Sequence, residues 1–392
     1  MKIAFVYDGL YPYLKGGAER RYFELATRLG ERHEVHYITW RHWGAARSAA
    51  HEGFTVHGVG APRPFYGEDG KRTVGEAAAF ALHVLPALRQ RRYDVIDCSA
   101  TPYLPLYACW VAARATRTPL VATWHEFWGD HWKAYLPERP VVAHMAQRIE
   151  AAARPLGDVR VAVSPFTAER LAAGSGGTIA HVVGNGVSID AIKRIPRSRD
   201  ASDIIFVGRL IEDKKVDVLL QVVHRLLDEF PVIRCTIVGD GPEREHLERL
   251  AASLSLGANV RFTGSMDDAQ IFGLMKAAKT LALPSIREGF GITVIEAQAS
   301  GCVPVVVRGP HTAAPDLVRN EFDGLVCDPT AESLAASLAS LLRDPGRLAA
   351  MKARGKRSAV KSDWDQVAIQ MEDLYHEAQA GVEARAGVLV GS

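Results

Sequence analysis

Residues 280–300 read T-L-A-L-P-S-I-R-E-G-F-G-I-T-V-I-E-A-Q-A-S. The first four residues, Thr280–Leu283, form a short apolar run typical of a buried parallel strand. A loop with two glycines follows, and a helical pattern begins near Ile292. A strand, a glycine-containing loop and a helix in this order predict one unit of a parallel α/β sheet. Backbone N–H groups of such a loop and of the helix N-terminus form an anion site.

The same unit recurs along the whole chain. Apolar runs predict strands at residues 3–7, 35–39, 55–59, 95–98, 120–123 and 160–163, and again at 204–207, 234–238, 260–263, 280–283 and 303–307. Helical patterns lie between many of them, at residues 17–28, 74–90, 105–115, 216–227, 244–253, 269–276, 292–299 and 331–342. We therefore predict an α/β protein with two doubly wound parallel sheets, whose strand ends face a shared cleft.

The length of 392 residues exceeds one ordinary hydrophobic core, so two domains are expected. A polar, basic stretch with Pro196 separates the two sets of strands. We predict an N-terminal domain over residues 1–190, a linker over 191–200 and a C-terminal domain over 201–361. A last helix over 362–380 follows, and the small, polar residues 381–392 are expected to form a disordered tail.

Composition narrows the class of protein. The chain has 47 Lys and Arg against 45 Asp and Glu, a balance that argues against a nucleic-acid-binding protein. The five cysteines lie in or beside apolar stretches without a C-x-x-C pair, which indicates small core residues in a reducing compartment. The first apolar run is too short for a signal peptide, and no run approaches the roughly 20 apolar residues of a spanning helix. We expect a cytoplasmic protein.

Two carboxylates follow the strand at 280–283. Glu288 precedes the predicted helix, where an anion site excludes a carboxylate, so its natural partner is a neutral hydroxyl donor, such as that of a sugar. Glu296 lies eight residues further on, about 12 Å along a helix, whereas a retaining glycosidase pair is about 5 Å apart. The spacing indicates two separate hydroxyl contacts, one on a sugar and one on a ribose. The alternative is that both are ordinary solvated residues.

Two cations follow the strand at 204–207. Arg209 comes just after the strand, and Lys214 stands five residues on, before the next helix. A planar guanidinium and a point-charge ammonium at a strand end suit a diphosphate. Ordinary solvated side chains are an equally good interpretation. The stretch V-G-D-G-P-E at 238–243 lacks the third glycine of a dinucleotide fingerprint, so hydride transfer is a poor hypothesis.

The first half offers two further candidates. Gly16 and Gly17 follow the first strand, and their N–H groups suit a phosphate, although a plain tight loop explains them equally well. His125 follows the strand at 120–123, where an imidazole suits a sugar contact. A purely structural histidine is the alternative.

Taken together, these stretches resemble the family-4 retaining glycosyltransferases of the GT-B fold, which consists of two Rossmann-like doubly wound domains facing a cleft. The resemblance covers nearly the whole chain. It is strongest over residues 206–328, with G-R-L at 208–210, Lys214, and Glu288 and Glu296 around an internal Gly-Phe-Gly. It implies a nucleoside-diphosphate sugar donor, UDP- or GDP-linked, a hydroxyl acceptor, and retention of configuration.

The resemblance also implies residue roles. Arg209 and Lys214 neutralise the diphosphate, Glu288 contacts the donor sugar, and His125 approaches the transferred sugar; these four are the candidate catalytic residues. Glu296 takes the ribose hydroxyls, and the last helix crosses back to the N-terminal domain. The candidate donor-binding residues are Gly16, Gly17, Gly208, Ser265, Met266, Gly289, Phe290, Gly291 and Glu296.

No metal or other cofactor is expected. Asp363 and Asp365 form the D-x-D string of metal-dependent glycosyltransferases, but their place at a helix start favours capping. Arg209 and Lys214 supply the positive charge that a divalent cation provides to a leaving diphosphate.

The acceptor side is open. Helix 74–92 ends in Arg89, Arg91 and Arg92, which suits a lipid-linked acceptor on an anionic membrane. A core helix with basic residues at its C-terminus is the favoured interpretation. The pathway hypotheses are natural-product (aminoglycoside-type) or cell-envelope glycan synthesis, in a monomer or homodimer. The alternatives are a sugar-nucleotide epimerase of the same fold or a peripheral-membrane glycolipid mannosyltransferase.

Overall fold

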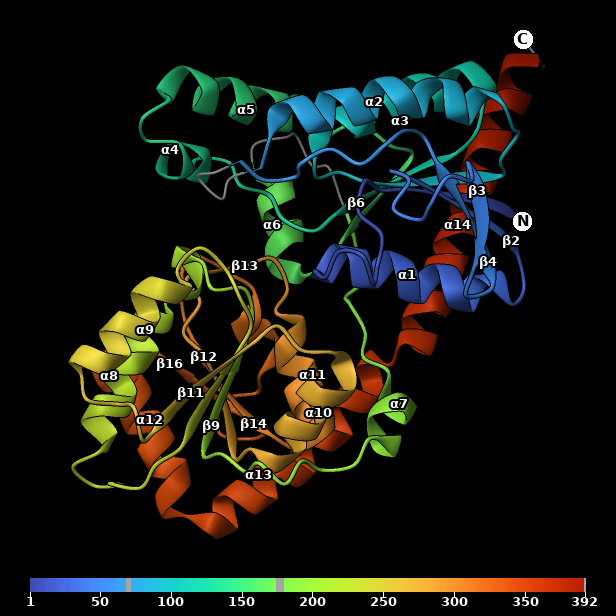
Figure 1. Cartoon of the computed structure of the whole chain (residues 1–392). Helices are drawn as coiled ribbons and strands as arrows, with labels where there is room; N and C mark the ends of the chain where they lie inside the picture. The colour runs from blue at the N-terminus through green and yellow to red at the C-terminus, as the bar shows by residue number, and fades with distance from the viewer. Residues whose placement is uncertain (68–71, 174–179, 391–392) are drawn as a thin grey trace. The chain divides into compact units, whose positions relative to one another are not determined.

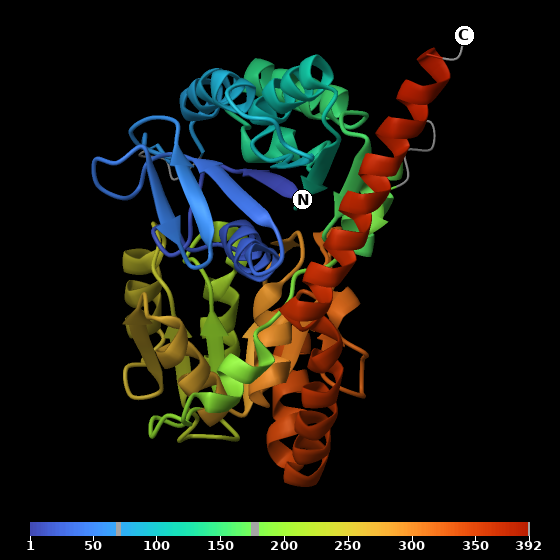
Figure 2. The same ribbon diagram turned by 90° about the vertical axis from the view of Figure 1, so that its right-hand side faces the viewer.

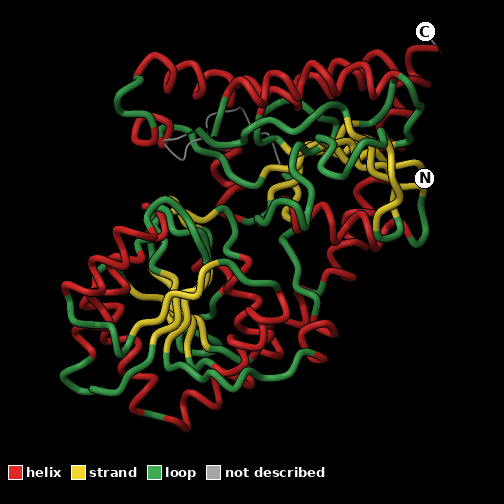
Figure 3. Tube along the Cα trace, in the orientation of Figure 1, coloured by secondary structure: helices red, strands yellow, loops and turns green. Residues whose placement is uncertain are grey.

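The computed structural model describes residues 1–67, 72–173 and 180–390. The chain divides into two compact units. The first unit comprises Met1–Asn185 and Trp364–Ser392, and the second comprises Gly186–Asp363. Each has a β-sheet between layers of helices (Figure 1 and Figure 3). The predicted linker overlaps a short helix of the second unit, α7 (Ile189–Arg194).

The first unit contains an eight-stranded sheet in the order β3-β4-β2-β1-β5-β6-β7-β8. The strands are β1 (Lys2–Val6), β2 (Glu34–Thr39), β3 (Ser48–His51), β4 (Phe54–Gly58), β5 (Val95–Ser99), β6 (Leu120–Trp124), β7 (Val159–Ala162) and β8 (His181–Val182). Every neighbouring pair is parallel except β3 and β4. The chain order reverses direction between β1 and β5, which is the switch point of a doubly wound sheet.

Helices cover both faces of this sheet (Figure 1 and Figure 2). They are α1 (Gly17–Gly30), α2 (Val74–Arg89), α3 (Tyr103–Thr116), α4 (His131–Tyr135), α5 (Pro140–Ala153), α6 (Pro165–Ala172) and α14 (Trp364–Val390). Alternate residues of β1 face opposite layers. Ala4 and Val6 pack with α2 and α3, whereas Phe5 packs with the rings of Tyr22 on α1 and Tyr375 on α14.

A buried carboxylate attaches α14 to this sheet. Asp97 on β5 is fully buried and accepts hydrogen bonds from the hydroxyls of Tyr22 (2.9 Å), Thr123 (2.9 Å) and Tyr375 (2.6 Å). Burial raises the pKa of Asp97, and these hydrogen bonds oppose the shift. The last helix therefore belongs to the first unit, although 178 residues of the second unit precede it in the chain.

The second unit contains a six-stranded parallel sheet in the order β11-β10-β9-β12-β14-β16. The strands are β9 (Ile204–Val207), β10 (Cys235–Val238), β11 (Val260–Gly264), β12 (Thr280–Leu283), β14 (Val303–Val307) and β16 (Leu325–Cys327), with a separate parallel pair, β13 (Arg287–Glu288) and β15 (His311–Thr312). The α-helices after α7 are α8 (Val216–Leu226), α9 (Arg244–Ser253), α10 (Asp268–Ala277), α11 (Ile292–Ser300), α12 (Ala331–Arg343) and α13 (Pro345–Ala359), and the 3-10 helices are η1 (Glu212–Lys214), η2 (Ala314–Leu317) and η3 (Val360–Ser362).

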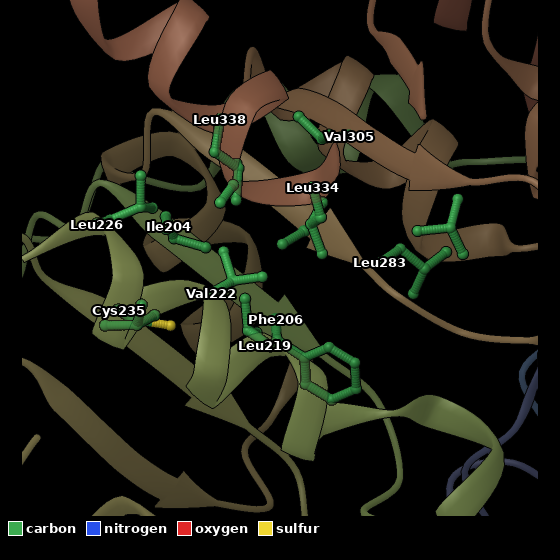
Figure 4. Close-up of a cluster of buried hydrophobic side chains, with 14 of the residues drawn as sticks. Ile204, Phe206, Leu219, Val222, Leu226, Cys235, Leu283, Val305, Leu334 and Leu338 are labelled. Carbon is green, nitrogen blue, oxygen red and sulfur yellow. The ribbon is translucent and has the colours of Figure 1, made fainter. Parts of the chain in front are cut away.

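The core of the second unit lies between this sheet and the helices α8 and α12. Figure 4 shows side chains of β9, α8 and α12 meeting there. The labelled members are Ile204, Phe206, Leu219, Val222, Leu226, Cys235, Leu283, Val305, Leu334 and Leu338, all buried. Complete burial of such aliphatic side chains contributes about 1.5–3 kcal/mol each relative to exposure.

The predicted α/β class and parallel sheets are confirmed, but several elements were missed. Strands β3 and β16 and helices α5 and α13 had no prediction. The helix α14 continues to Val390, where the composition predicted a disordered tail after residue 380. Residues 381–390 contain two glycines and three valines, so propensity alone does not explain this helix, but adding residues to an existing helix needs no new nucleation.

All five cysteines are buried and unpaired, which confirms the expectation of small core residues.

A close backbone contact joins the loops after β9 and β10. Gly239 has φ +133°, and a Cβ atom there would lie 1.9 Å from the carbonyl oxygen of Gly208. The N–H of Gly208 donates to Val238 O (3.0 Å), and that of Leu210 donates to Asp240 O (2.9 Å). The V-G-D-G stretch is therefore a packing element that fixes the course of the Gly208–Leu210 segment.

This contact predicts a large effect of Gly239→Ala. The methyl group meets backbone, which cannot rotate away, and the backbone conformation is strained for any L side chain. We expect a loss of at least about 3 kcal/mol in the free energy of unfolding, measured by urea titration. Gly257→Ala is the matched control, because a Cβ atom there meets nothing within 4 Å. Equal midpoints for the two variants would contradict the prediction.

Candidate functional site

The switch point of the second sheet lies between β9 and β12. From this pair the sheet continues through β10 and β11 on the side of β9, and through β14 and β16 on the side of β12. The β9–β12 ladder pairs Ile204 with Thr280 and Ile205 with Leu281, whereas both strands continue for two more residues. Open α/β sheets bind ligands at the carboxyl ends of the strands at such a position.

Two adjacent ion pairs connect the loops that follow these strands. Lys214 of η1 pairs with Glu288 of β13. Next to it, Nε of Arg287 lies 2.7 Å from Oδ2 of Asp213, and Ile286 N–H donates to Asp213 O (3.0 Å). The four side chains are only 13–22% exposed. Partly buried pairs are screened less by salt than surface pairs, so these contacts hold the two loops in a defined arrangement.

The backbone after Glu288 leads directly into α11. The carbonyl of Glu288 accepts from Ala313 N–H (2.8 Å), and Gly289, Phe290 and Gly291 are buried. Gly291 adopts φ +94°, a left-handed conformation that favours glycine, and among the described residues no side chain caps the helix. The first N–H groups of α11 are thus oriented for an anion.

The other predicted donor residues occupy the same edge of the sheet. Arg209 is exposed and lies two residues after β9. Ser265 and Met266 directly follow β11. Glu296 is half-buried on α11. The structure thus brings Lys214 and Glu288 into contact and places the remaining predicted residues of this unit at the carboxyl edge or on the helix that begins there.

Three residues of this site had no prediction. Ser285 lies two residues after β12 and is 1% exposed, and its Oγ has no hydrogen-bond partner among the described residues. Buried polar atoms are nearly always paired in folded proteins, so the Ser285 hydroxyl has unused hydrogen-bonding capacity at the switch point. Asp213 and Arg287 are 74 residues apart, and no sequence signal connects them.

In the first unit, His125 follows β6 and packs beside two tyrosines. Its ring centroid lies 6.5 Å from that of Tyr7 and 6.0 Å from that of Tyr22. Its Nε2 is buried without a hydrogen-bond partner in the described part of the chain. Burial, and to a lesser degree the charge of Arg21, lowers the pKa of His125 to about 3. The imidazole is therefore neutral at physiological pH.

A second unpaired buried atom lies near the end of β1. Asp8 is fully buried, and its Oδ2 pairs with Arg72, while Oδ1 has no partner among the described residues. Like His125, Asp8 follows a strand at the carboxyl edge of the sheet. The switch-point edge of the first unit therefore also carries polar atoms with unused hydrogen-bonding capacity.

Gly16 and Gly17 lie at the start of α1. A Cβ atom at Gly16 would be 2.4 Å from Oε2 of Glu19, whereas one at Gly17 would meet nothing within 4 Å. Burial raises the pKa of Glu19, whose Oε1 lies 3.4 Å from the Tyr7 hydroxyl. The structure thus explains Gly16 through the space that Glu19 needs, and the phosphate role of both glycines stays a prediction.

Comparison with known proteins agrees with this architecture. Residues 15–191 match the family model "Glycosyltransferase Family 4", and residues 188–358 match "Glycosyl transferases group 1". A D-inositol 3-phosphate glycosyltransferase of Streptomyces avermitilis is 30% identical over 93% of this chain and 83% of its own length. The chain belongs to glycosyltransferase family 4.

Other proteins extend the comparison of this glycosyltransferase. A phosphatidyl-myo-inositol mannosyltransferase of Mycolicibacterium smegmatis is 30% identical over 58% of this chain and 59% of its own. The sucrose-phosphate synthase of Thermosynechococcus elongatus has a TM-score of 0.80 at 20% identity, covering 97% of this chain and 99% of that one. Anabaena HepE in complex with UDP-glucose has a TM-score of 0.75 at 19% identity, covering 96% and 100%. These neighbours support the GT-B fold, with its two Rossmann-like domains.

The two aspartates of the D-x-D string have separate partners in the glycosyltransferase. Asp363 accepts from Ile189 N–H (3.3 Å), and Asp365 pairs with Arg28. Among the described residues, no group of three or more His, Cys, Asp or Glu side chains is arranged to hold a metal ion. In the same part of the chain, no helix is long and apolar enough to cross a bilayer.

The lowered pKa of His125 predicts a pH-dependent stability. The ordinary pKa is 6.5, so on acidification the unfolded chain takes up the proton before the folded one does. The stability from neutral His125 is complete above about pH 6.5 and is lost as the pH falls towards about 3. We expect His125→Gln to remove about 2 kcal/mol of the stability difference between pH 7 and pH 5, measured by urea unfolding.

His376→Gln, on the exposed side of α14, is the matched control and should keep the wild-type pH dependence. The prediction fails if His125→Gln and wild type lose equal stability on acidification.

Proposed function

We propose that this glycosyltransferase moves a hexose-type sugar from a nucleoside-diphosphate sugar to a hydroxyl acceptor, with retention of configuration. The donor assignment rests on the two ion pairs, Lys214–Glu288 and Asp213–Arg287, that join the loops after β9 and β12 at the switch point. The two loops present a lysine, a carboxylate and the N-terminus of α11 at one edge of one sheet. A diphosphate linked to a polyhydroxyl ring has the complementary groups, anionic oxygens and neutral hydroxyls.

The Lys214–Glu288 pair explains how a carboxylate is compatible with an anion site. An ammonium group has three N–H donors, so Lys214 can contact Glu288 and a phosphate oxygen together. The pairing offsets the charge of Glu288, and its second oxygen can accept from a sugar hydroxyl. Arg209 supplies further positive charge, and Ser285 adds a hydroxyl to the same contacts.

Catalysis then rests on positioning and on charge stabilisation. The acceptor oxygen bonds to the anomeric carbon on the face that the diphosphate leaves. The anomeric carbon–oxygen bond to phosphate breaks, and the acceptor proton passes to a diphosphate oxygen. Lys214, Arg209 and the N–H groups of α11 stabilise the developing charge, so we propose that no metal is required. The neutral imidazole of His125 is proposed as a hydrogen-bond partner of the transferred sugar.

The names of similar proteins guide the choice of substrates to test. HepE was solved with UDP-glucose, and relatives are named for D-inositol 3-phosphate and phosphatidyl-myo-inositol. We therefore propose a panel of UDP-, GDP- and ADP-sugars as donors and of cyclitols, aminoglycosides and glycan fragments as hydroxyl acceptors. A donor at 100 times its Kd stabilises the folded protein by about 2.7 kcal/mol, which a thermal-shift assay detects.

The decisive experiment is turnover with the stabilising donor, followed by NMR of the anomeric proton in the product. A product with the anomeric configuration of the donor supports the proposal, and an inverted product overturns retention. Activity should persist in excess EDTA. Isomerisation of the donor without any acceptor would indicate an epimerase instead.

Substitutions of the charged groups test the donor site. We expect Arg209→Ala and Glu288→Ala each to lower turnover roughly 10²-fold, because each removes a contact to charge or to the sugar in the transition state. Arg225→Ala is the control, since this arginine forms an exposed pair with Glu332 on another surface of the same unit. Near-wild-type rates in both site variants would remove the assignment.

A positioning role is predicted for Arg287. In Arg287→Met, Asp213 loses its partner, so the loop that carries Lys214 is less firmly held. We expect kcat to fall about tenfold with KM changed less than about twofold, since donor contacts remain but their alignment is relaxed. Arg287→Lys should restore part of kcat. An unchanged kcat would show that the second ion pair is dispensable.

A further inference from the structure

Three carboxylates lie at the carboxyl edge of the first sheet. Asp8 follows β1, Glu19 lies in the first turn of α1, and Glu76 lies in the first turn of α2. Asp8 and Glu76 are 0% and 2% exposed, and Glu19 is half-buried. Arg72 pairs with both Asp8 and Glu76, whereas no cation of the described residues forms an ion pair with Glu19. In the described part of the chain, one arginine therefore serves three carboxylates, which are here called the acidic cluster.

The pKa values of two of these carboxyls reflect their crowding. Burial, and next to it the charge of Asp8, raises the pKa of Glu76 to about 7. Burial also raises the pKa of Glu19, and the charge of Asp8 acts in the same direction. A nearby positive charge favours the ionised form of any carboxyl, so a cation would relieve this unfavourable crowding. The acidic cluster thus has an electrostatic preference for a positively charged ligand.

One oxygen of the acidic cluster has no protein partner. Oδ2 of Asp8 pairs with Arg72, and nothing among the described residues forms a hydrogen bond with Oδ1. An ionised carboxylate accepts hydrogen bonds on both oxygens, and buried polar atoms are nearly always paired. A ligand that brings an N–H donor to Oδ1 would complete the contacts of Asp8, whereas an anionic ligand would not.

Aromatic rings surround Asp8. The imidazole of His42 stacks with the rings of Tyr13 and Phe65, at centroid distances of 5.8 Å and 6.1 Å. Nε2 of His42 lies 3.2 Å from the carbonyl oxygen of Asp8, and the guanidinium of Arg72 lies 5.1 Å from the centroid of Phe65. Tyr13 is 51% exposed. An exposed aromatic face packs against apolar surface and attracts cations, so it suits a ring that carries a positive charge.

We propose that this edge recognises a positively charged amino group on the hydroxyl acceptor, so that the acceptor is an amino sugar or an aminocyclitol. The inference rests on the transfer to a hydroxyl acceptor proposed above. The ammonium group donates to Oδ1 of Asp8, and the charges of Glu19 and Glu76 attract it. The exposed ring of Tyr13 packs against the acceptor ring. The other hydroxyl groups of the acceptor remain available for transfer.

Other ligands fit the acidic cluster less well. A metal ion needs several ligands around one point, and no group of three or more His, Cys, Asp or Glu side chains in the described ranges is so arranged. A phosphate-bearing acceptor would meet the carboxylates, while Arg72 is already paired with two of them. A neutral polyol would leave the excess of negative charge without compensation. An ammonium group satisfies both the charge and the unpaired oxygen.

The test is transfer to two matched pairs of acceptors, with the donor that stabilises the protein. The pairs are glucosamine with glucose and scyllo-inosamine with scyllo-inositol, whose members differ by an ammonium in place of a hydroxyl group. We expect kcat/KM for the transferred amine to exceed that for its hydroxyl counterpart about tenfold, because a hydrogen bond between charged groups is stronger than a neutral one. Glucose 6-phosphate and D-inositol 3-phosphate should be poorer acceptors than the neutral compounds.

Two isosteric substitutions assign the preference to the acidic cluster. Asp8→Asn and Glu76→Gln each remove a charge, and Gln at 76 keeps an acceptor for the indole N–H of Trp40. Each should lower the ratio of kcat/KM between an amine and its hydroxyl counterpart about fivefold. Asp373→Asn is the matched control, because this aspartate is exposed on α14. Folding of each variant is checked by its thermal transition.

The outcomes separate this proposal from that of the donor site. A preference for the neutral or phosphorylated compounds, or wild-type ratios in both variants, would overturn the amine assignment, as would donor binding without transfer to either amine. If the donor neither binds nor reacts, the proposed transfer fails, and thermal unfolding without donor decides the amine site. Glucosamine should then raise the unfolding midpoint above that with glucose at equal ionic strength, and Asp8→Asn should remove the difference. Equal midpoints in wild type would overturn the amine assignment.

Discussion

The crossing of two loops at the β9–β12 switch point is the constraint on which the proposed donor site depends. Successive parallel strands are added on opposite sides of the β9–β12 pair. The loops after β9 and β12, 74 residues apart in the chain, therefore lie at one edge of the sheet. The Asp213–Arg287 and Lys214–Glu288 pairs then join them. Without the reversal of strand order, a lysine after β9 and a glutamate after β12 would have no reason to meet. The chemistry proposed for this enzyme therefore follows from sheet topology as much as from residue type.

Glycines in this unit have two distinct uses. Gly239 permits an approach of backbone to backbone that no side chain allows, and so fixes the Gly208–Leu210 segment. Gly291 supplies the left-handed residue that turns the chain from β13 into α11 and exposes the helix N-terminus. One glycine is a packing device and the other shapes the site. Their similar sequence surroundings, G-D-G and G-F-G, do not distinguish these roles.

Buried carboxylates organise the first unit. Asp97 accepts from three hydroxyl groups, of which that of Tyr375 attaches α14 to the sheet. Glu76 and Glu150 hold neighbouring segments against α2 and α5. Burial raises the pKa of each, so the hydrogen bonds are needed to keep such groups inside. The carboxylates of α2 and α5 therefore serve internal hydrogen bonds, and neither helix exposes an acidic side chain.

The order of elements, the α/β class and most strands were predictable, because apolar periodicity is a local property of the chain. The Glu288–Glu296 stretch and the resemblance that it carries also identified the glycosyltransferase family from residues alone. Ser285, the Asp213–Arg287 pair and the inward direction of Glu150 were not predictable, since each depends on which distant segment the fold brings alongside. A short strand such as β16 forms because a neighbouring strand pairs with it, and α14 extends to Val390 because an existing helix adds residues without new nucleation. A local sequence pattern contains neither kind of information.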